Sequence, residues 1–233
     1  MRIEPETSAV SIVMIGSFNP RIFRPEWFQK AGILGATETE AAKIRIIHEA
    51  VSAFSLDWGS IQVDQNRFSI DTADPPFIRI HDVVLKSFKE FLNHTPIYQL
   101  GINRLVHFSV GSFDIRDRIG RLLAPHEPWG KWASRIAGDP DKPQIRGGMR
   151  SLVMGQVDRG DGLQGSINAK VEPSVLLADG IYMDVNDHFV LGSPDEILSS
   201  ELAMNILAEQ WPKSIERSEW IIDQIMALKE QVK

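Results

Sequence analysis

Arg104 is the residue whose place in the sequence points most directly to a specific interaction. Apolar and polar side chains alternate from Tyr98 to Val110, and Arg104 falls among the apolar ones. Alternate side chains of a strand share one face, so the guanidinium should lie on the buried side. A buried charge requires a partner. We expect a carboxylate such as Asp57 or Asp184, in a structural ion pair or, alternatively, in a cleft that recognises an anion.

Asp184, Asn186 and His188 alternate along a later predicted strand, and such oxygen and nitrogen groups can ligate metals. A strand face with an Asn-Asp turn explains the same residues. No two of the six histidines occur as HxH, HxxxH or HExxH. The sequence therefore predicts no metal, no cofactor and no catalytic residue. A metal-assisted hydrolase would need at least three of Asp184, Asn186, His188 and His107 to converge within coordination distance.

Asn19 follows a predicted strand and precedes a short helix, where backbone N–H groups could bind an anion. A turn shaped by Asn19 and Pro20 is the alternative, and no Gly-Lys-Ser/Thr loop supports nucleotide binding. The chain also lacks a Gly-x-Ser-x-Gly nucleophile elbow. An enzyme is therefore not the favoured interpretation.

Five residues in the middle of the chain are interface candidates. Arg116, Arg118 and Arg121 lie around one predicted helix, and Trp129 and Trp132 follow in a stretch rich in Pro and Gly. Tryptophan is enriched at binding hot spots, and long connections tend to be functional. A solvated helix face and burial of the rings in the core are the alternatives.

The composition excludes several kinds of binding partner and chemistry. A net charge of −6 argues against a binder of duplex nucleic acid, and the absence of cysteine excludes thiol and disulfide chemistry. Residues 104–150 are net basic, whereas residues 151–233 are strongly acidic. A solvated face explains such an asymmetry, and docking between copies or with a partner is the alternative. Apolar runs of about six residues are far shorter than the roughly 20 that cross a bilayer. We expect a cytoplasmic protein that does not bind membranes.

The elements that must position these residues follow from periodicity. Strands are predicted at 10–18, 54–63 with a bend at Gly59, around 68–70, and at 98–110, 151–158, 163–174 and 181–191. Helices are predicted to open at Pro25, to cover 39–50 and 76–93, and to begin at Asp114 and around Trp132. Ser193 should cap a further helix that Pro212 breaks or kinks, before a last helix over 214–229.

These elements predict an α+β fold. A curved, mainly antiparallel sheet of six or seven strands should carry helices on one face. Two halves share a β-α-β-β-(β)-α plan without a repeat of residues. Residues 1–233 should form a single domain, with a long excursion at 125–148.

The strand Leu100-Gly-Ile-Asn-Arg104-Leu resembles the Leu-Gly-Leu-Arg-Tyr-Asn-type strand of a sporadically distributed family of uncharacterised bacterial proteins. The strand Tyr182-Met-Asp184-Val and the long helix after it are similar too, so that the resemblance spans roughly residues 50–230. This chain departs from the family at its N-terminus and places Asn before Arg. The resemblance implies a bacterial protein of patchy distribution, of the kind found in accessory or defence loci, with no known activity.

Three functions remain in competition. The leading hypothesis is a non-catalytic binding or assembly protein, whose partner is a second copy or another protein. It would act through a sheet face or through the tryptophan-bearing stretch. The alternatives are a domain that binds an anionic small molecule through Arg104 and the metal-assisted hydrolase.

Overall fold

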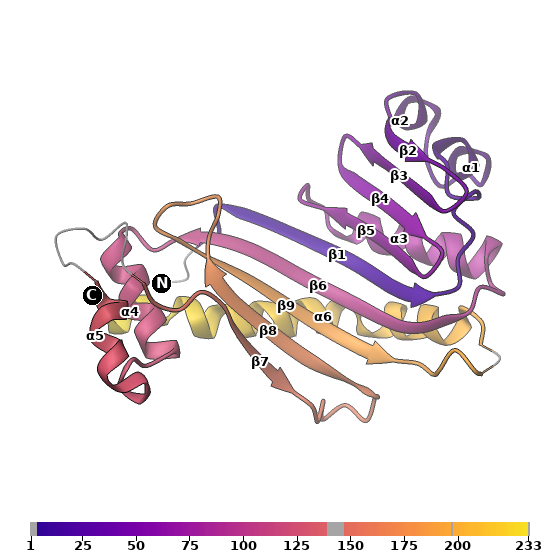
Figure 1. The fold of residues 1–233 in the computed structure, drawn as a ribbon. Coiled ribbons are helices and arrows are strands. Elements are labelled where there is room, and N and C mark those ends of the chain that lie inside the picture. Colours follow the sequence, from indigo (N-terminus) through magenta and orange to yellow (C-terminus); the bar gives the residue numbers. More distant parts are fainter. Residues whose placement is uncertain (1–3, 139–146, 197, 233) are drawn as a thin grey trace.

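The computed structural model describes residues 4–138, 147–196 and 198–232. Within them one nine-stranded antiparallel sheet has the order β2-β3-β4-β5-β1-β6-β9-β8-β7 (Figure 1). The strands are β1 (Thr7–Gly16), β2 (Lys43–Ile47), β3 (Val51–Leu56), β4 (Gly59–Asp64), β5 (Arg67–Thr72), β6 (Ile97–Ser109), β7 (Leu152–Gln156), β8 (Gly165–Pro173) and β9 (Gly180–Val190). The predicted α+β class with an antiparallel sheet is confirmed.

The sheet has nine strands rather than six or seven for two reasons. The helix predicted over 39–50 is wrong, because its second part is strand β2, in which Lys43 and Arg45 alternate with isoleucines. The bend predicted at Gly59 is also wrong, because Gly59 opens β4 after a tight turn. A side chain at Gly59 would place its Cβ 2.5 Å from the carbonyl oxygen of Asp71 on β5. Close strand approach therefore requires this glycine.

The long C-terminal helix, yellow in Figure 1, runs along the sheet behind β9, whereas the first two helices lie beside β2. The helical elements are α1 (Pro25–Lys30), α2 (Ala36–Glu40), α3 (Ile78–Lys86), the π-helical turn η1 (Ser87–Phe91), α4 (Phe113–Leu123), the 3₁₀ turn η2 (Glu127–Trp132), α5 (Ala133–Ala137), α6 (Glu201–Met226) and α7 (Leu228–Gln231). Helix α3 packs against β1 and β5, and α6 packs against β6 and β9. Among the described residues, no helix combines the length and apolarity needed to cross a membrane.

Helix α6 differs from its prediction at both its start and its middle. Ser193 forms only a turn, in which its N–H donates to Glu196 Oε2 at 3.0 Å. The helix begins instead at Glu201, directly after Ser200, whose hydroxyl donates to the carbonyl oxygen of Phe88 at 2.6 Å. Pro212 lies inside the continuous helix on its exposed side. Packing of the helix on the sheet therefore outweighs the hydrogen bond that proline removes.

The order of strands and helices agrees with the prediction of two halves that share one plan. β1 and β6 lie side by side at the centre of the sheet, with β5, β4 and β3 outward from β1 and β9, β8 and β7 outward from β6. α3 follows β5, and α6 follows β9. Each half is thus a strand, a helical connection, three strands and a helix, and β2 is an addition to the first half.

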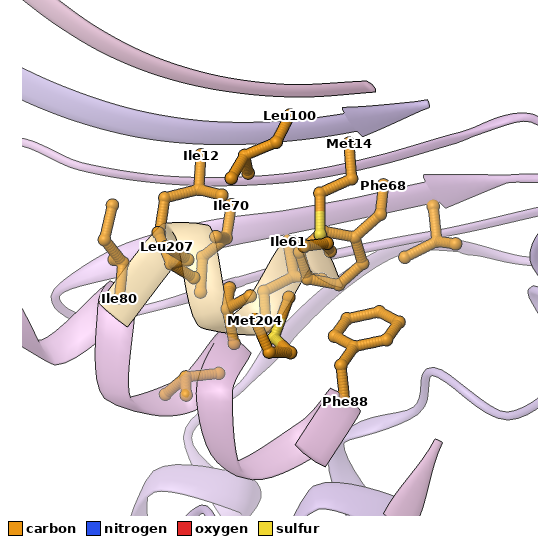
Figure 2. Close-up of a cluster of buried hydrophobic side chains, with 14 of the residues drawn as sticks. Ile12, Met14, Ile61, Phe68, Ile70, Ile80, Phe88, Leu100, Met204 and Leu207 are labelled. Atoms are coloured by element: carbon orange, nitrogen blue, oxygen red, sulfur yellow. The ribbon is translucent and has the colours of Figure 1, made fainter. Parts of the chain in front are cut away.

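The core beneath the sheet forms two apolar clusters. The larger cluster joins β1, β3, β4, β5, the first part of β6, the end of β9, α1, α3, η1 and the first half of α6 (Figure 2). It includes Ile12, Met14, Ile61, Phe68, Ile70, Ile80, Phe88, Leu100, Met204 and Leu207. The smaller cluster lies under β6, β8 and β9 and includes Val106, Phe108, Met183 and Ile222. Arg104 on β6 and Asp187 on β9 lie between the two clusters and are both buried. Charged residues therefore divide one continuous helix–sheet interface.

Candidate functional site

Arg104 lies in the helix–sheet interface, as its strand parity predicted. Its side chain is 6% exposed, and its Nε donates to Glu219 Oε1 at 2.6 Å. Its Nη1 also donates to the carbonyl oxygen of Ala9 at 3.1 Å, and the guanidinium carbon lies 5.1 Å from the centre of the Phe77 ring. Burial and ionic pairing are thus confirmed, and every contact described is structural.

The expected partners of Arg104 are wrong. Asp57 lies in the turn between β3 and β4, and Asp184 points to the opposite face of β9. Glu219 comes from α6, 115 residues further along the chain. Parity shows that a charge is buried, but only the packing of α6 on β6 shows which carboxylate meets it.

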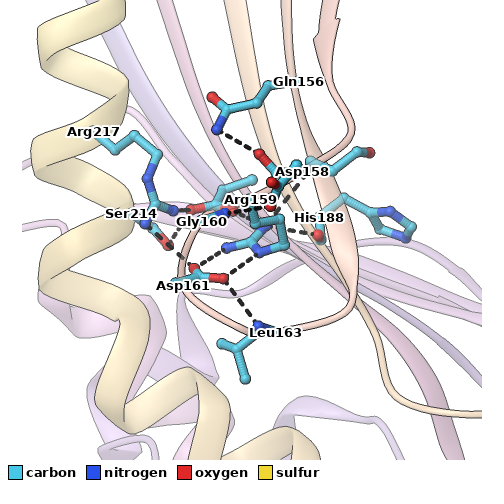
Figure 3. A network of polar contacts seen from close by, with 11 residues as sticks. Gln156, Asp158, Arg159, Gly160, Asp161, Leu163, His188, Ser214 and Arg217 are labelled. Carbon is cyan, nitrogen blue, oxygen red and sulfur yellow. Dashed lines mark hydrogen bonds and ion pairs between the residues drawn. The ribbon is translucent and has the colours of Figure 1, made fainter.

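Figure 3 shows a larger charged network that includes Arg159, Asp161 and Arg217. Its two arginines pair with Asp187, which sequence reasoning missed. Asp187 is fully buried, and its Oδ1 accepts from Arg159 Nη1 at 2.5 Å. Its Oδ2 accepts from Ser214 Oγ at 2.7 Å and from Arg217. Arg159 also pairs with Asp161 at 2.9 Å. The network therefore ties the β7–β8 connection and β9 to α6.

The sequence signal for this network is the parity of β9. Asp187 has the same parity as Met183, Val185 and Phe189, all of which are buried. The Asn186-Asp187 pair is also typical of a turn. If these residues are taken as a turn, the strand alternation that predicts burial of Arg104 is not applied to Asp187. We call the charged residues between the two apolar clusters the ionic layer; they are Arg104, Glu219, Asp187, Arg159, Asp161 and Arg217.

Electrostatics within the ionic layer stabilises the charged forms. Burial by itself would raise the pKa of Asp161, but the hydrogen bond from Arg159, the Leu163 N–H and the two guanidinium charges bring the pKa below its usual value. Burial likewise opposes the charge of Arg159, yet Asp161 and Asp187 raise its pKa. Each charge is compensated within the layer, which indicates a structural role.

The β7–β8 connection also has glycines with Gly-x-Gly-x-x-Gly spacing, at Gly160, Gly162 and Gly165. A dinucleotide site needs this spacing between a strand and the N-terminus of a helix. Here it joins two antiparallel strands, and Gly165 lies so close to β9 that a Cβ would be 2.0 Å from the His188 carbonyl oxygen. The glycines therefore serve the turn and the close strand pairing.

The face of the sheet that points away from α6 is polar near its centre. Asp184, Asn186 and His188 share this face of β9, as predicted. His188 Nε2 lies 3.2 Å from Gln99 Oε1. Asp184 Oδ1 and Asn186 Oδ1 are buried without a hydrogen bond to any described residue. Asn103 on β6 is directly opposite Asn186 in the register.

The titratable groups on this polar face are shifted mainly by burial. Burial and the charges of Asp184 and Glu172 raise the pKa of Tyr182 to about 12. Burial and Glu172 raise the pKa of Asp184, and Lys170 only partly opposes them. Burial lowers the pKa of His107. Its ring packs against that of Tyr182 in a tilted arrangement, with the ring centres 4.7 Å apart. No group of three or more His, Asp or Glu side chains among the described residues could hold a metal ion.

Asn19 shapes a turn. Its side-chain oxygen accepts from the Arg21 N–H at 3.2 Å, and its carbonyl oxygen accepts from the Ile22 N–H at 3.1 Å. It therefore contacts the backbone rather than a cleft, which agrees with the turn interpretation.

Trp129 and Trp132 lie on η2 and are each 56% exposed. Their ring centres are 5.5 Å apart in a T-shaped contact. Together with Ile136 and Met149 they line a cavity of about 580 Å³, and we call these four residues the tryptophan surface. Within the part of the chain that the structure describes, neither ring is buried in the core. Residues 139–146 of the predicted excursion lie outside the described residues.

The three arginines of α4 do not form one patch. Arg116 donates to the carbonyl oxygen of Ala178 at 2.7 Å, and Arg118 donates to that of Val232 at 3.0 Å. Arg116 and Arg121 line a second cavity of about 550 Å³ together with Arg150, and Asp117 and Glu172 lie on its wall too. Arg118 does not line this cavity, so Arg116 and Arg121 remain the candidates for binding from α4.

Comparison with protein-family models and with curated proteins finds no match to the chain.

Proposed function

We propose that this chain is a non-catalytic binding and assembly protein that docks a partner protein on the tryptophan surface. The observation that supports this proposal is the exposure of Trp129 and Trp132, each 56% exposed and in contact with the other. Contiguous apolar patches on a folded chain commonly mark an interaction site. Burying a large apolar side chain contributes about 1.5–3 kcal/mol, so the two rings can anchor a partner.

The charge around the tryptophan surface defines the chemistry of the partner. Arg135 and Arg150 line the same cavity, and Lys131 lies between the two rings in the sequence. Complementary charge mainly sets orientation and association rate, whereas apolar anchors supply affinity. The partner should therefore present an apolar side chain on an acidic surface.

Photo-crosslinking tests this proposal. A photoreactive residue replaces Trp132, the chain is expressed in its source organism, and mass spectrometry identifies the crosslinked protein. Trp220, which is 63% exposed on α6, provides the matched control position. We expect one protein with an acidic contact surface at position 132 and none at position 220, because only the former lies in the apolar cavity.

Affinity for the identified protein gives the second readout. Trp129→Ser with Trp132→Ser should weaken binding by at least about tenfold with an unchanged melting temperature, and Trp220→Ser should change neither quantity. A large drop in melting temperature for the double variant would show that the rings support the fold. Equal crosslinking at positions 132 and 220 would show that no specific partner docks there.

The second cavity supports a further candidate function, the binding of an anionic small molecule. Arg116, Arg121 and Arg150 line this cavity of about 550 Å³. Guanidinium groups bind carboxylate and phosphate in a bidentate manner. This candidate keeps the anion chemistry first expected of Arg104 but assigns it to other arginines.

A thermal-shift measurement distinguishes this candidate. Citrate or inorganic phosphate should raise the melting temperature relative to sodium chloride of equal ionic strength, and Arg121→Ser should abolish the rise. Arg45→Ser on β2 serves as the control, because this arginine lies far from the cavity along the sheet order. Equal stabilisation of all three proteins would reduce the effect to general screening and contradict the candidate.

A further inference from the structure

The two edges of the sheet differ in how they are protected. β2 forms one edge and β7 the other. Natural sheets protect an exposed edge with charged side chains, bulges or prolines, because free backbone groups would otherwise pair with another strand. β2 carries Lys43 and Arg45, and its pairing with β3 contains a register shift. This edge therefore has two recognised devices against association.

β7 has neither charge nor bulge. From Ser151 to Val157 the sequence contains no charged residue and no proline. Its pairing with β8 runs without a register shift. Val153 is 57% exposed, Met154 is 66% exposed and Val157 is 83% exposed. An uncharged, apolar edge of high β propensity is a site of strand addition or aggregation unless a partner covers it.

We propose that β7 pairs antiparallel with β7 of a second copy of this chain, with Met154 at the two-fold axis. The sheet then continues from one copy into the other, and the unprotected edge becomes an interface. This inference does not depend on the proposed function, because the tryptophan surface and β7 share no residue. Arg150 and Ser151 line the cavity of the tryptophan surface and directly precede β7.

Charge complementarity selects this register. Arg150 and Asp158 each lie two residues beyond an end of β7, at the same sequence separation from Met154, and both are exposed. An antiparallel pair centred on Met154 places Arg150 of each copy opposite Asp158 of the other, so the symmetry creates two ion pairs. A shift of the centre by one residue removes both pairs. Self-pairing of β2 would instead bring its cations together, and like charges opposite each other are destabilising.

Side-chain volume favours the same register. Val153 and Gly155 lie on the face of the sheet that points away from α6, opposite Lys170 and Asn168 of β8. The pairing centred on Met154 places Val153 of each copy opposite Gly155 of the other. A Cβ at position 155 would lie 2.8 Å from Asn168 Oδ1, so a larger residue there is already disfavoured within one chain. The glycine leaves room for the valine across the interface.

Sedimentation equilibrium of the full chain between about 1 and 100 μM tests the edge contact. We expect a dimer, and Met154→Lys should weaken it by at least about tenfold because two ammonium groups would meet at the axis. Ile44→Lys is the matched control, since Ile44 is 53% exposed on the opposite edge. It should leave the dimer unchanged, and both variants should keep the melting temperature within a few degrees.

A charge exchange tests the register. Arg150→Glu and Asp158→Arg should each weaken the dimer, whereas the double variant should restore it to near the wild-type affinity. Circular dichroism confirms the fold of each variant. Failure of the double variant to recover would overturn the register centred on Met154.

Two results would overturn the edge contact itself. The first is a monomer at the highest concentration, and the second is a dimer that Met154→Lys does not weaken. If Trp129→Ser with Trp132→Ser abolishes that second dimer, the copy–copy contact lies on the tryptophan surface. A monomer that still binds the crosslinked partner would contradict this inference and leave the proposed function intact.

Discussion

Asp187 is a single buried charge on which we expect the stability of the fold to depend. It is fully buried and accepts hydrogen bonds from Arg159, Ser214 and Arg217. Asp187→Asn preserves the shape of the side chain but leaves two guanidinium groups without this carboxylate. We expect a loss of roughly 3 kcal/mol in the free energy of unfolding, because removing one partner leaves an uncompensated buried charge. Urea unfolding measures this loss.

An exposed ion pair provides the control for Asp187. Arg21 and Glu49 form a pair in which both side chains are 61% exposed. Glu49→Gln should change the free energy of unfolding by less than about 1 kcal/mol, because solvent screens the pair. Equal effects of the two substitutions would show that Asp187 is not held by the ionic layer.

Two histidines on the polar face make stability depend on pH. Burial lowers the pKa of His107 below 6.5. Burial and the charge of Arg159 do the same for His188. The unfolded chain therefore binds protons more readily than the folded chain below about pH 6.5, so stability falls as the pH falls from there toward the folded pKa values. Urea unfolding at pH 7.5 and pH 5.5 should show this loss.

His107→Gln with His188→Gln isolates these two groups. The double variant should lose less stability than the wild type between the two pH values, because the protonation that favours unfolding is gone. An identical pH dependence in both proteins would assign the effect to other groups.

The alternation of side chains along β6 predicts that Arg104 is buried, but it does not predict which carboxylate pairs with it. The alternation of Tyr98 to Val110 was enough to place this residue among apolar neighbours, because the side-chain period of a strand is two. Glu219 was beyond reach, since nothing local links β6 with one turn of α6. Asp187 could have been predicted by the same parity argument. The exposure of Trp129 could not have been predicted in this way, because it depends on whether other segments of the chain pack over the ring.

Pro212 gives a prediction at the level of one helix. It lies inside α6, where it removes one backbone hydrogen bond that the continuous helix could make. Pro212→Ala should therefore raise the free energy of unfolding, by at most about 3 kcal/mol. Urea unfolding tests it, with Lys213→Ala as the control on the next exposed residue. A less stable Pro212→Ala variant would show that α6 needs the proline to fit the sheet.

Local patterns predicted most elements, and the exceptions have clear causes. Long strands such as β6 and β9 were predicted because their alternation is sustained. β2 was missed because five residues of mixed isoleucine and basic side chains fit either period. The start of α6 was misplaced because Ser193 and Glu196 have the capping spacing but form only a turn. Tertiary anchoring of Ser200 on Phe88 decides where the helix begins.

The whole molecule should unfold as one unit although its core has two clusters. β6, β9 and α6 run through both clusters and through the ionic layer between them. Neither cluster can lose its strands without exposing the other, so we expect a single transition. Calorimetry tests this, because the calorimetric and van't Hoff enthalpies should agree. Two resolved transitions would show two independent cores.

The ionic layer also constrains how the sequence can vary over evolution. Apolar residues within either cluster can exchange with one another as long as volume is kept. A change in Asp187 or Arg159, by contrast, needs a simultaneous change in its partner, so single steps are blocked. Related chains should therefore show two variable regions in the core, separated by a narrow band of residues that change only together. That band would preserve the axial position of α6 on the sheet while the residues on either side diverge.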